Sequence, residues 1–299
     1  MTTILDGGLA TELEARGHDL RDRLWSARLL ATDPDAIADV HLAYFRAGAE
    51  VATTATYQAS LEGFAAAGID RAEALALMRH GVELAIAARE RFVADERAAG
   101  RDPGRLLVAG SVGPYGAMLA DGSEYRGDYD PGRAGFEAFH RPRIEALVEA
   151  GADILALETI PTVREAEVLV ELAGKAGIPA WLAYTTRDGE RTSAGEPFEE
   201  AFAVAEGAAG IVAVGINCSA PRHVRAMLER AAGTITIDLI AYANRGDRWD
   251  PGARTWNDEP AETWDATEVA TWAGLGARWL GGCCGTGPAE IARLAAALR

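Results

Sequence analysis

Residues 151–185 read GADILALETIPTVREAEVLVELAGKAGIPAWLAYT, and this stretch decides the fold. A Gly-Ala pair leads into the apolar run 154–158. Residues 164–173 then carry apolar side chains three and four positions apart, and 180–185 form a second apolar run. This order is typical of a strand, an amphipathic helix and another strand. Strands joined by a helical crossover pair in parallel, since a tight hairpin can join only antiparallel strands.

The same unit recurs along the whole chain. Strands are predicted at residues 3–6, 51–57, 106–112, 154–158, 180–185, 211–218, 235–243 and 279–283, with further helices at 72–98 and 136–149. Gly48, Gly151 and Gly276 precede strands, where a glycine ends a helix in a left-handed turn. About eight such units indicate an α/β protein of the (β/α)8 TIM-barrel type. We therefore expect residues 1–299 to form one barrel domain.

An open doubly wound sheet is the alternative fold. Its glycine-rich dinucleotide fingerprint should follow the first strand. Residues 6–10 read DGGLA instead, which does not match that fingerprint.

Charge and composition exclude several functions. The formal net charge is −16, which disfavours binding to a phosphate backbone. The acidic charge is explained by solubility, and the alternative is that it favours a cationic small molecule. The N-terminus lacks the basic and apolar regions of a secretory signal, and no apolar run is long enough to span a bilayer. Three cysteines without a signal do not suggest a disulfide framework. We expect a cytoplasmic protein that binds neither nucleic acid nor membrane.

The carboxyl ends of the predicted strands carry the unusual side chains. Active sites of TIM barrels lie at this face. The residues there are Asp6, Tyr57, Gln58, Ser111, Glu158, Thr185, Asn217, Cys218, Asn244, Cys283 and Cys284. Every cysteine of the chain is in this set, and only one strand separates the sixth strand from the eighth. The three thiols are therefore predicted to meet at one rim.

Three thiolates suit a zinc ion, which takes sulfur ligands in tetrahedral geometry and can keep a fourth position for substrate. Gly281 and Gly282 before the cysteine pair, and Gly285 after it, are expected to let the backbone turn both sulfurs inward. Two other interpretations stand beside this one. The cysteines could be buried small apolar residues. A redox dithiol is the other, although Cys-x-x-Cys spacing is missing.

Other features have structural and functional interpretations. The five histidines are expected on the surface or in helix packing. Residues 113–135 form a long predicted loop that suits a lid, and 245–260 form a second one. Glu158 could bind a substrate ammonium or form a rim salt bridge, and Asp6 could bind substrate or cap a helix. Asn217 and Asn244 could bind substrate or hydrogen-bond within loops.

The chain resembles the homocysteine S-methyltransferases, most closely the bacterial and plant type that uses S-methylmethionine or S-adenosylmethionine. The matching stretches are 5–17 (LDGGLATELEARG), 24–27 (LWSA), 54–60 (TATYQAS), 110–117 (GSVGPYGA), 119–127 (LADGSEYRG), 157–161 (LETIP), 215–218 (GINC) and 281–284 (GGCC). Two segments differ from the usual family pattern. Residues 242–247 read YANRGD where relatives have Tyr-Pro-Asn-Ser-Gly-Glu, and 285–288 read GTGP where many have Arg-Thr-Thr-Pro.

The resemblance implies an enzyme that transfers methyl from a sulfonium to the thiol of L-homocysteine, giving methionine. It implies Zn2+ held by Cys218, Cys283 and Cys284, and an amino group of homocysteine held by Asp6 and Glu158. The predicted substrate-binding set is Asp6, Gly7, Tyr57, Gln58, Glu158, Asn217 and Asn244. The aromatic rings of Tyr57, Tyr115 or Trp25 are candidates to face the donor cation.

Several alternatives stay open at the level of sequence. The same site could use betaine as donor or selenocysteine as acceptor. A barrel could instead carry a purely structural zinc, or bind a sulfur amino acid without turnover. The oligomeric state is either monomer or homodimer.

Overall fold

The computed structural model describes residues 2–20, 24–246, 249–250, 255–256, 262 and 264–299. Eight of the described strands form one parallel sheet, with the order β1-β10-β7-β6-β5-β4-β3-β2. Their bounds are β1 Thr3–Ile4, β2 Val51–Thr53, β3 Leu107–Val112, β4 Ile154–Ile160, β5 Ala180–Tyr184, β6 Ile211–Asn217, β7 Asp238–Ala243 and β10 Ala277–Gly282. The short antiparallel pair β8 (Trp249–Asp250) and β9 (Thr255–Trp256) lies outside this sheet.

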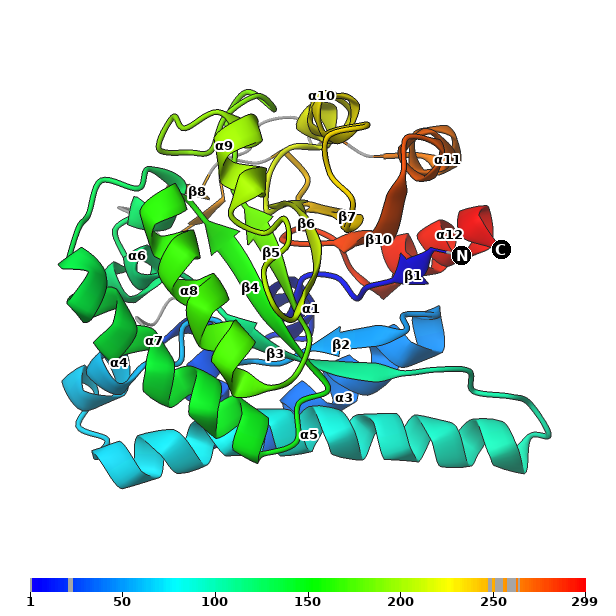
Figure 1. Ribbon diagram of the computed structural model, residues 1–299. Coiled ribbons are helices and arrows are strands. Elements are labelled where there is room, and N and C mark those ends of the chain that lie inside the picture. Colours follow the sequence, from blue (N-terminus) through cyan, green and yellow to red (C-terminus); the bar gives the residue numbers. More distant parts are fainter. Residues whose placement is uncertain (1, 21–23, 247–248, 251–254, 257–261, 263) are drawn as a thin grey trace.

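The sheet closes on itself between its first and last strands. Leu5 forms a parallel bridge with Val51, and the Asp6 backbone N–H donates to the Val51 carbonyl over 3.1 Å. The Glu50 backbone N–H donates to the Ile4 carbonyl over 2.7 Å. The predicted (β/α)8 barrel is therefore confirmed, with the helices outside the ring of strands (Figure 1).

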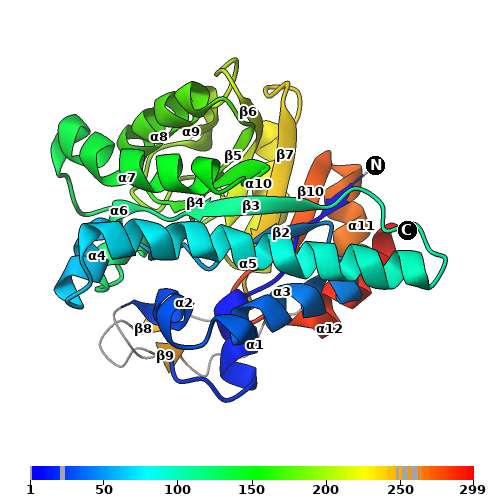
Figure 2. The same ribbon diagram turned by 90° about the horizontal axis from the view of Figure 1, so that it is seen from below.

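The helices follow the strands as the sequence predicts. The described ones are α1 Leu9–Ala15, η1 Trp25–Arg28, α2 Leu29–Thr32, α3 Pro34–Ala47, α4 Leu61–Ala66, α5 Arg71–Ala98, α6 Tyr115–Leu119, η2 Ser123–Tyr125, α7 Gly132–Glu149, α8 Val163–Ala176, α9 Phe198–Ala203, α10 Pro221–Ala231, α11 Ala266–Gly274 and α12 Pro288–Leu298. The long helix α5 runs beside α3, as Figure 2 shows. Gly48, Gly151 and Gly276 have φ of 101°, 91° and 107°, which confirms the left-handed turns before strands.

The strands bury both faces, which explains their almost continuous apolar sequences. Alternate strand residues form a cluster inside the ring: Leu5, Val51, Ala109, Ile154, Ala156, Trp181, Ala183, Ala213, Ile240 and Tyr242. The side chains between them, such as Leu155 and Leu157, point outward and join the larger core beneath the helices. This two-layer core holds the strand ends at fixed positions relative to one another.

Some predicted boundaries were wrong. The second strand ends at Thr53, so residues 54–57 turn away from the sheet, and the seventh begins at Asp238. Residues 113–135 are not one irregular loop, because α6, η2 and the start of α7 lie within them. Most of the second loop, 245–260, falls outside the described residues. Within the part of the chain that the structure describes, no helix is long and apolar enough to cross a membrane.

Candidate active site

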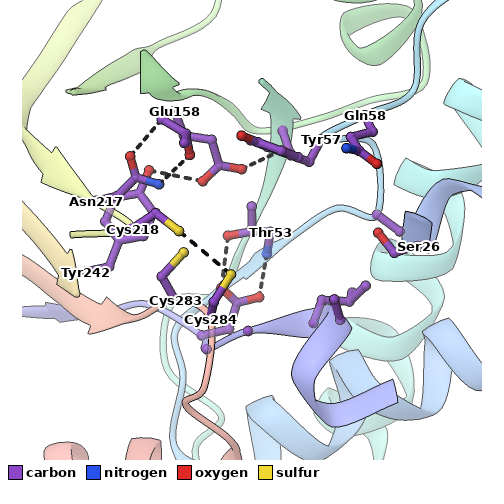
Figure 3. Close-up of a pocket in the computed structure, with 18 of the residues that line it drawn as sticks. Ser26, Thr53, Tyr57, Gln58, Glu158, Asn217, Cys218, Tyr242, Cys283 and Cys284 are labelled. Atoms are coloured by element: carbon purple, nitrogen blue, oxygen red, sulfur yellow. Dashed lines mark hydrogen bonds between the residues drawn. The ribbon is translucent and has the colours of Figure 1, made fainter. Parts of the chain in front are cut away.

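The three cysteines meet at the carboxyl ends of β6 and β10, the two strands that flank β7. Their sulfur atoms all lie within 4.8 Å of one another, and the Sγ atoms of Cys218 and Cys284 are 3.7 Å apart (Figure 3). Two sulfurs bound tetrahedrally at about 2.3 Å from one zinc would be about 3.8 Å apart. The donor set and its spacing therefore fit a zinc ion. Among the described residues, this group is the one cluster of potential metal ligands with that compactness.

Backbone hydrogen bonds to β7 fix the positions of Cys218 and Cys283. The Cys218 N–H donates to the Tyr242 carbonyl over 3.1 Å, and the Cys283 N–H donates to the Ala243 carbonyl over 2.8 Å. Cys218 itself has φ of 45°, a conformation that L-residues seldom adopt. Such local strain is typical of functional positions in a well-packed surrounding.

The glycines beside the cysteine pair have a different role from the one predicted. Only Gly285, with φ of 81°, needs the backbone freedom of glycine. Gly281 and Gly282 are instead required by close packing. A Cβ at Gly281 would lie 2.5 Å from the Leu5 Cβ, and one at Gly282 would lie 2.0 Å from the Thr286 Oγ1. Close approach of the neighbouring chain, rather than turning, selects glycine at these two positions.

The thiols are not equivalent. Hydrogen bonds from Cys283 and Cys284 lower the pKa of the Cys218 thiol well below its usual value. The same contacts and the negative charge on Cys218 raise the pKa of the Cys283 thiol, and those with Cys218 raise that of Cys284. The Tyr125 hydroxyl lies 3.3 Å from the Cys218 Sγ and can donate to it. The Cys218 sulfur is therefore the acceptor for hydrogen bonds from the other two thiols and from Tyr125.

Two buried carboxyls lie in the same cavity. Asp6 accepts hydrogen bonds from the Thr53 N–H over 2.7 Å and from its hydroxyl over 2.9 Å. Glu158 accepts from the Ser111 hydroxyl, and over 3.1 Å from the Tyr242 hydroxyl. Burial raises the pKa of Asp6 to about 8 and that of Glu158 to about 7, although these hydrogen bonds act in the opposite direction. Both carboxyls would gain stability from a cation placed between them.

The remaining predicted substrate residues fall into two groups. Gly7, Tyr57, Gln58 and Asn217 line the cavity with Asp6, Glu158 and the cysteines. The Asn217 side chain is already engaged, because its Oδ1 accepts from the Thr159 N–H and its Nδ2 donates to the Thr159 hydroxyl. Asn244 is not among the lining residues, and its Oδ1 accepts from the Gly246 N–H over 2.8 Å.

The structure adds lining residues that sequence reasoning did not select, and two of them belong to η2. Glu124 and Tyr125 of η2 line the cavity, and η2 lies against β4 and the end of β5. Glu124 is 6% exposed, and burial raises the pKa of its carboxyl to about 7. Both residues stand in the stretch 119–127 that carries the family resemblance. This stretch was the available signal, although nothing in it showed which side chains face the cavity.

The charge of the cavity has one sign. Its described lining carries the carboxyls of Asp6, Glu124 and Glu158 and the three thiols, with no lysine, arginine or histidine among them. His140 is fully buried in α7, in agreement with the predicted role of the histidines on the surface or in helix packing. A cavity with this lining attracts cations, which include a metal ion, an ammonium and a sulfonium.

A buried polar cluster beneath α6 supports the cavity wall. The guanidinium of Arg143 donates to the Gly113 and Tyr57 carbonyls, each over 2.9 Å. Glu165 accepts from the Tyr115 N–H over 2.6 Å and from the His140 Nε2 over 2.8 Å. Residues 113–117 are thereby fastened to α7 and α8.

The three aromatic residues predicted as candidates for a contact with the donor cation differ in their positions. The Tyr115 ring packs against Phe136 and Phe139 and is not part of the cavity lining. Tyr57 does line the cavity. The Trp25 side chain lies outside the described part of the structure.

The two departures from the family pattern contact each other. A Cβ at Gly285 would lie 2.4 Å from the Arg245 Cδ and 2.6 Å from its Cγ. The Arg245 side chain therefore fills the space over Gly285 and covers the turn that follows the cysteine pair. Residue 245 can be large here because residue 285 is a glycine.

Comparisons with known proteins agree with this geometry. A family model described as "Homocysteine S-methyltransferase" matches residues 3–298. The homocysteine S-methyltransferase of Escherichia coli (strain K12) is 48% identical over 98% of this chain and 94% of its own length. The homocysteine S-methyltransferase YbgG of Bacillus subtilis (strain 168) is 43% identical over 98% of this chain and 93% of its own length.

A solved structure is similar along its whole length. The metallated form of the homocysteine methyltransferase MmuM from Escherichia coli superposes with a TM-score of 0.89 and 47% identity, covering 99% of this chain and 96% of that one.

Proposed function

The chain belongs to the homocysteine S-methyltransferase family, and from this premise we propose that it transfers a methyl group from a sulfonium donor to L-homocysteine in a zinc-dependent reaction. The donor is S-methylmethionine or S-adenosylmethionine, and the product is methionine. The observation that carries the proposal is the compact group of three thiols in a cavity whose other charged residues are carboxyls. Residues 1–299 act in this proposal as one homocysteine-binding barrel.

Cys218, Cys283 and Cys284 would hold the zinc, which, when bound, supplies the positive charge that converts the homocysteine thiol to a thiolate at neutral pH. Three anionic ligands leave the substrate sulfur electron-rich, so it keeps its nucleophilicity. This arrangement does not require a histidine base.

Asp6 and Glu158 orient the acceptor in this proposal. Both carboxyls are buried at strand ends, and each is held by two hydrogen bonds. An ammonium between them would restore the ionised state that burial opposes, since an opposite charge lowers a carboxyl pKa. The amino group of homocysteine provides that charge.

The transfer itself neutralises charge. The acceptor sulfur forms a bond to the donor methyl carbon while the carbon–sulfur bond of the sulfonium breaks, and the electron pair leaves with the donor sulfur. Anion and cation both become neutral, so a cavity with little water favours the step. The cluster formed by Arg143 and Glu165 keeps the wall over the cavity in place.

The deciding experiment measures methionine formation from homocysteine with each sulfonium in parallel, on protein of assayed zinc content. We expect methionine with one zinc per chain, and loss of both in Cys283→Ala. Asp128→Asn, an exposed substitution outside the cavity, should retain both. Zinc without methionine from any sulfonium would refute the proposed donor class, and betaine or a selenol acceptor would then be tested.

A further inference from the structure

Two hydrogen-bond acceptors in the cavity have no partner in the described structure. They are the Oε2 of Glu124 and the Oε1 of Gln58, and both atoms are buried. Each side chain lines the cavity that contains the thiols. Buried acceptors without a partner are rare in folded proteins, because each costs about 1–3 kcal/mol. Here two of them share one cavity, which indicates a ligand that brings positive charge or hydrogen-bond donors.

Glu124 differs in this respect from the other two carboxyls. Asp6 and Glu158 are each held by two hydrogen bonds from the protein. The Glu124 carboxyl is similarly buried, yet its Oε2 has no such bond. A buried carboxylate oxygen without a hydrogen-bond donor weakens the fold, and a ligand that supplies a donor or a positive charge would offset this cost.

The position of Glu124 is fixed by the surrounding backbone. The Thr185 hydroxyl at the end of β5 donates to the Glu124 carbonyl over 3.3 Å, and the Arg187 Nη2 donates to the Tyr125 carbonyl over 2.6 Å. α6 packs directly on η2, since a Cβ at Gly116 would lie 2.7 Å from the Glu124 nitrogen. The backbone of residues 124 and 125 is thus held by contacts with the end of β5, with Arg187 and with α6.

Gln58 is held against the same short helix. Its Nε2 donates to the Ala117 carbonyl of α6 over 3.2 Å, which orients Oε1 as an acceptor. Gln58 and Glu124 therefore approach the cavity from the two segments that pack on α6. Tyr125, next to Glu124, reaches the Cys218 sulfur with its hydroxyl. A ligand bound at Glu124 would lie beside the thiol cluster.

We propose that Glu124, with Gln58 as a second acceptor, forms the subsite that binds the cationic methyl donor. This inference rests on the proposed function. The carboxylate receives the positive charge of the donor, at either its sulfonium or its ammonium group, and Gln58 accepts from the same ligand. Asp6 and Glu158 then bind the amino group of the acceptor. The donor is bound by one carboxyl, Glu124, and the acceptor by two.

The test is calorimetric titration of S-methylmethionine into zinc-loaded wild-type protein and Glu124→Gln. A charge-assisted contact in a buried site predicts donor affinity about 10- to 100-fold weaker in the variant. Homocysteine affinity and zinc content should stay within twofold of wild type. Glu124→Asp, which keeps the charge, should lose less than the glutamine variant. Asp128→Asn removes one exposed carboxylate nearby and should bind donor normally.

Two further ligands identify the group that Glu124 binds. Dimethylsulfonioacetate carries a sulfonium without an ammonium, and methionine carries an ammonium without a sulfonium. Weakening of either one in Glu124→Gln supports the subsite and assigns the charge. Unchanged affinity for all three ligands overturns it.

The experiments distinguish a failure of the donor subsite from a failure of the proposed function. If the wild type forms methionine while Glu124→Gln binds donor unchanged, the subsite is wrong and the proposed function stands. If the wild type binds no sulfonium, both are wrong. Glu124→Gln removes a buried charge whose Oε2 has no partner, so its thermal stability should equal or exceed that of the wild type. Loss of folding in Glu124→Gln would contradict the inference. The donor titration would in that case be made with Glu124→Asp.

Discussion

Gly282→Ala tests how the cysteine pair is held, because it adds one methyl group beside the thiols and substitutes none of the three cysteines. The new Cβ would lie 2.0 Å from the Thr286 Oγ1 and 2.6 Å from the Thr286 Cβ. Neither atom is at the far end of a flexible side chain. The Thr286 hydroxyl also donates to the Cys283 carbonyl over 2.5 Å, and the Thr286 N–H donates to the same oxygen over 3.1 Å.

The expected size of the effect follows from these distances. Non-bonded carbon and oxygen atoms are seldom closer than about 3 Å, so the chain must shift by about 1 Å at Gly282 or Thr286. Metal sites tolerate ligand displacements of about 0.2 Å. The shift exceeds this tolerance several-fold and acts on the residue next to Cys283. We expect zinc affinity to fall about 10- to 100-fold, as for lost supporting contacts, and stability to fall by about 1–3 kcal/mol.

Chelator competition measures the zinc affinity, and urea unfolding measures the stability. The matched control is Gly274→Ala in α11, where nothing lies within 4 Å of the added methyl. It should bind zinc as wild type does and gain about 0.5–1 kcal/mol, since alanine favours a helix over glycine. Zinc affinity within threefold of wild type in Gly282→Ala would refute the packing argument.

Two other predictions concern buried charges. The pKa of Glu158 is about 7 in the fold against an ordinary 4.5, so the contribution of this carboxyl to stability should fall by at most about 3 kcal/mol as pH rises from 4.5 to 7. Asp6 and Glu124, whose pKa values are also raised, should add changes of the same sign. Urea unfolding at pH 5 and 7.5 should show this fall in wild type and a smaller one in Glu158→Gln; equal slopes would contradict it. Arg143→Met leaves the Tyr57 and Gly113 carbonyls without their donor and should cost about 3–5 kcal/mol of unfolding free energy. Arg141→Met, exposed on the same helix, should change it by less than about 0.5 kcal/mol, and similar losses in the two variants would disprove the role of the buried guanidinium.

The strand-end part of the site could be predicted because topology fixes it. Once alternating strands and helices indicate a barrel, every residue after a strand belongs to one rim. Cys218 and Cys283 are 65 positions apart in the chain, yet the strand order places their strands on either side of β7. Asp6 and Glu158 follow by the same rule and do line the cavity.

The loop part could not be predicted in this way, because its path depends on buried side-chain contacts. The position of Tyr115 depends on Glu165, which accepts its backbone N–H from another helix. Nothing in the spacing of residues 113–135 shows that Glu124 faces the cavity and Tyr115 does not. Asn244 shows the opposite case. It follows a strand end, but its side-chain oxygen accepts a hydrogen bond from the Gly246 N–H two residues on, and the side chain does not line the cavity.

The two sides of the cavity are held by different means, and this has a consequence for specificity. The Cys218 and Cys283 N–H groups both donate to carbonyls of β7, so the thiols move only if the barrel deforms. Glu124 depends on η2, which contacts the barrel mainly through side chains, among them the Thr185 hydroxyl and the Arg187 guanidinium, and packs on α6. Substitutions in η2 can therefore reshape this part of the cavity wall while the distances among the sulfurs stay constant. With the acceptor bound at the strand ends and the donor at Glu124, as proposed, substitutions in a few loop residues would change the choice of donor while the sheet keeps the acceptor site constant.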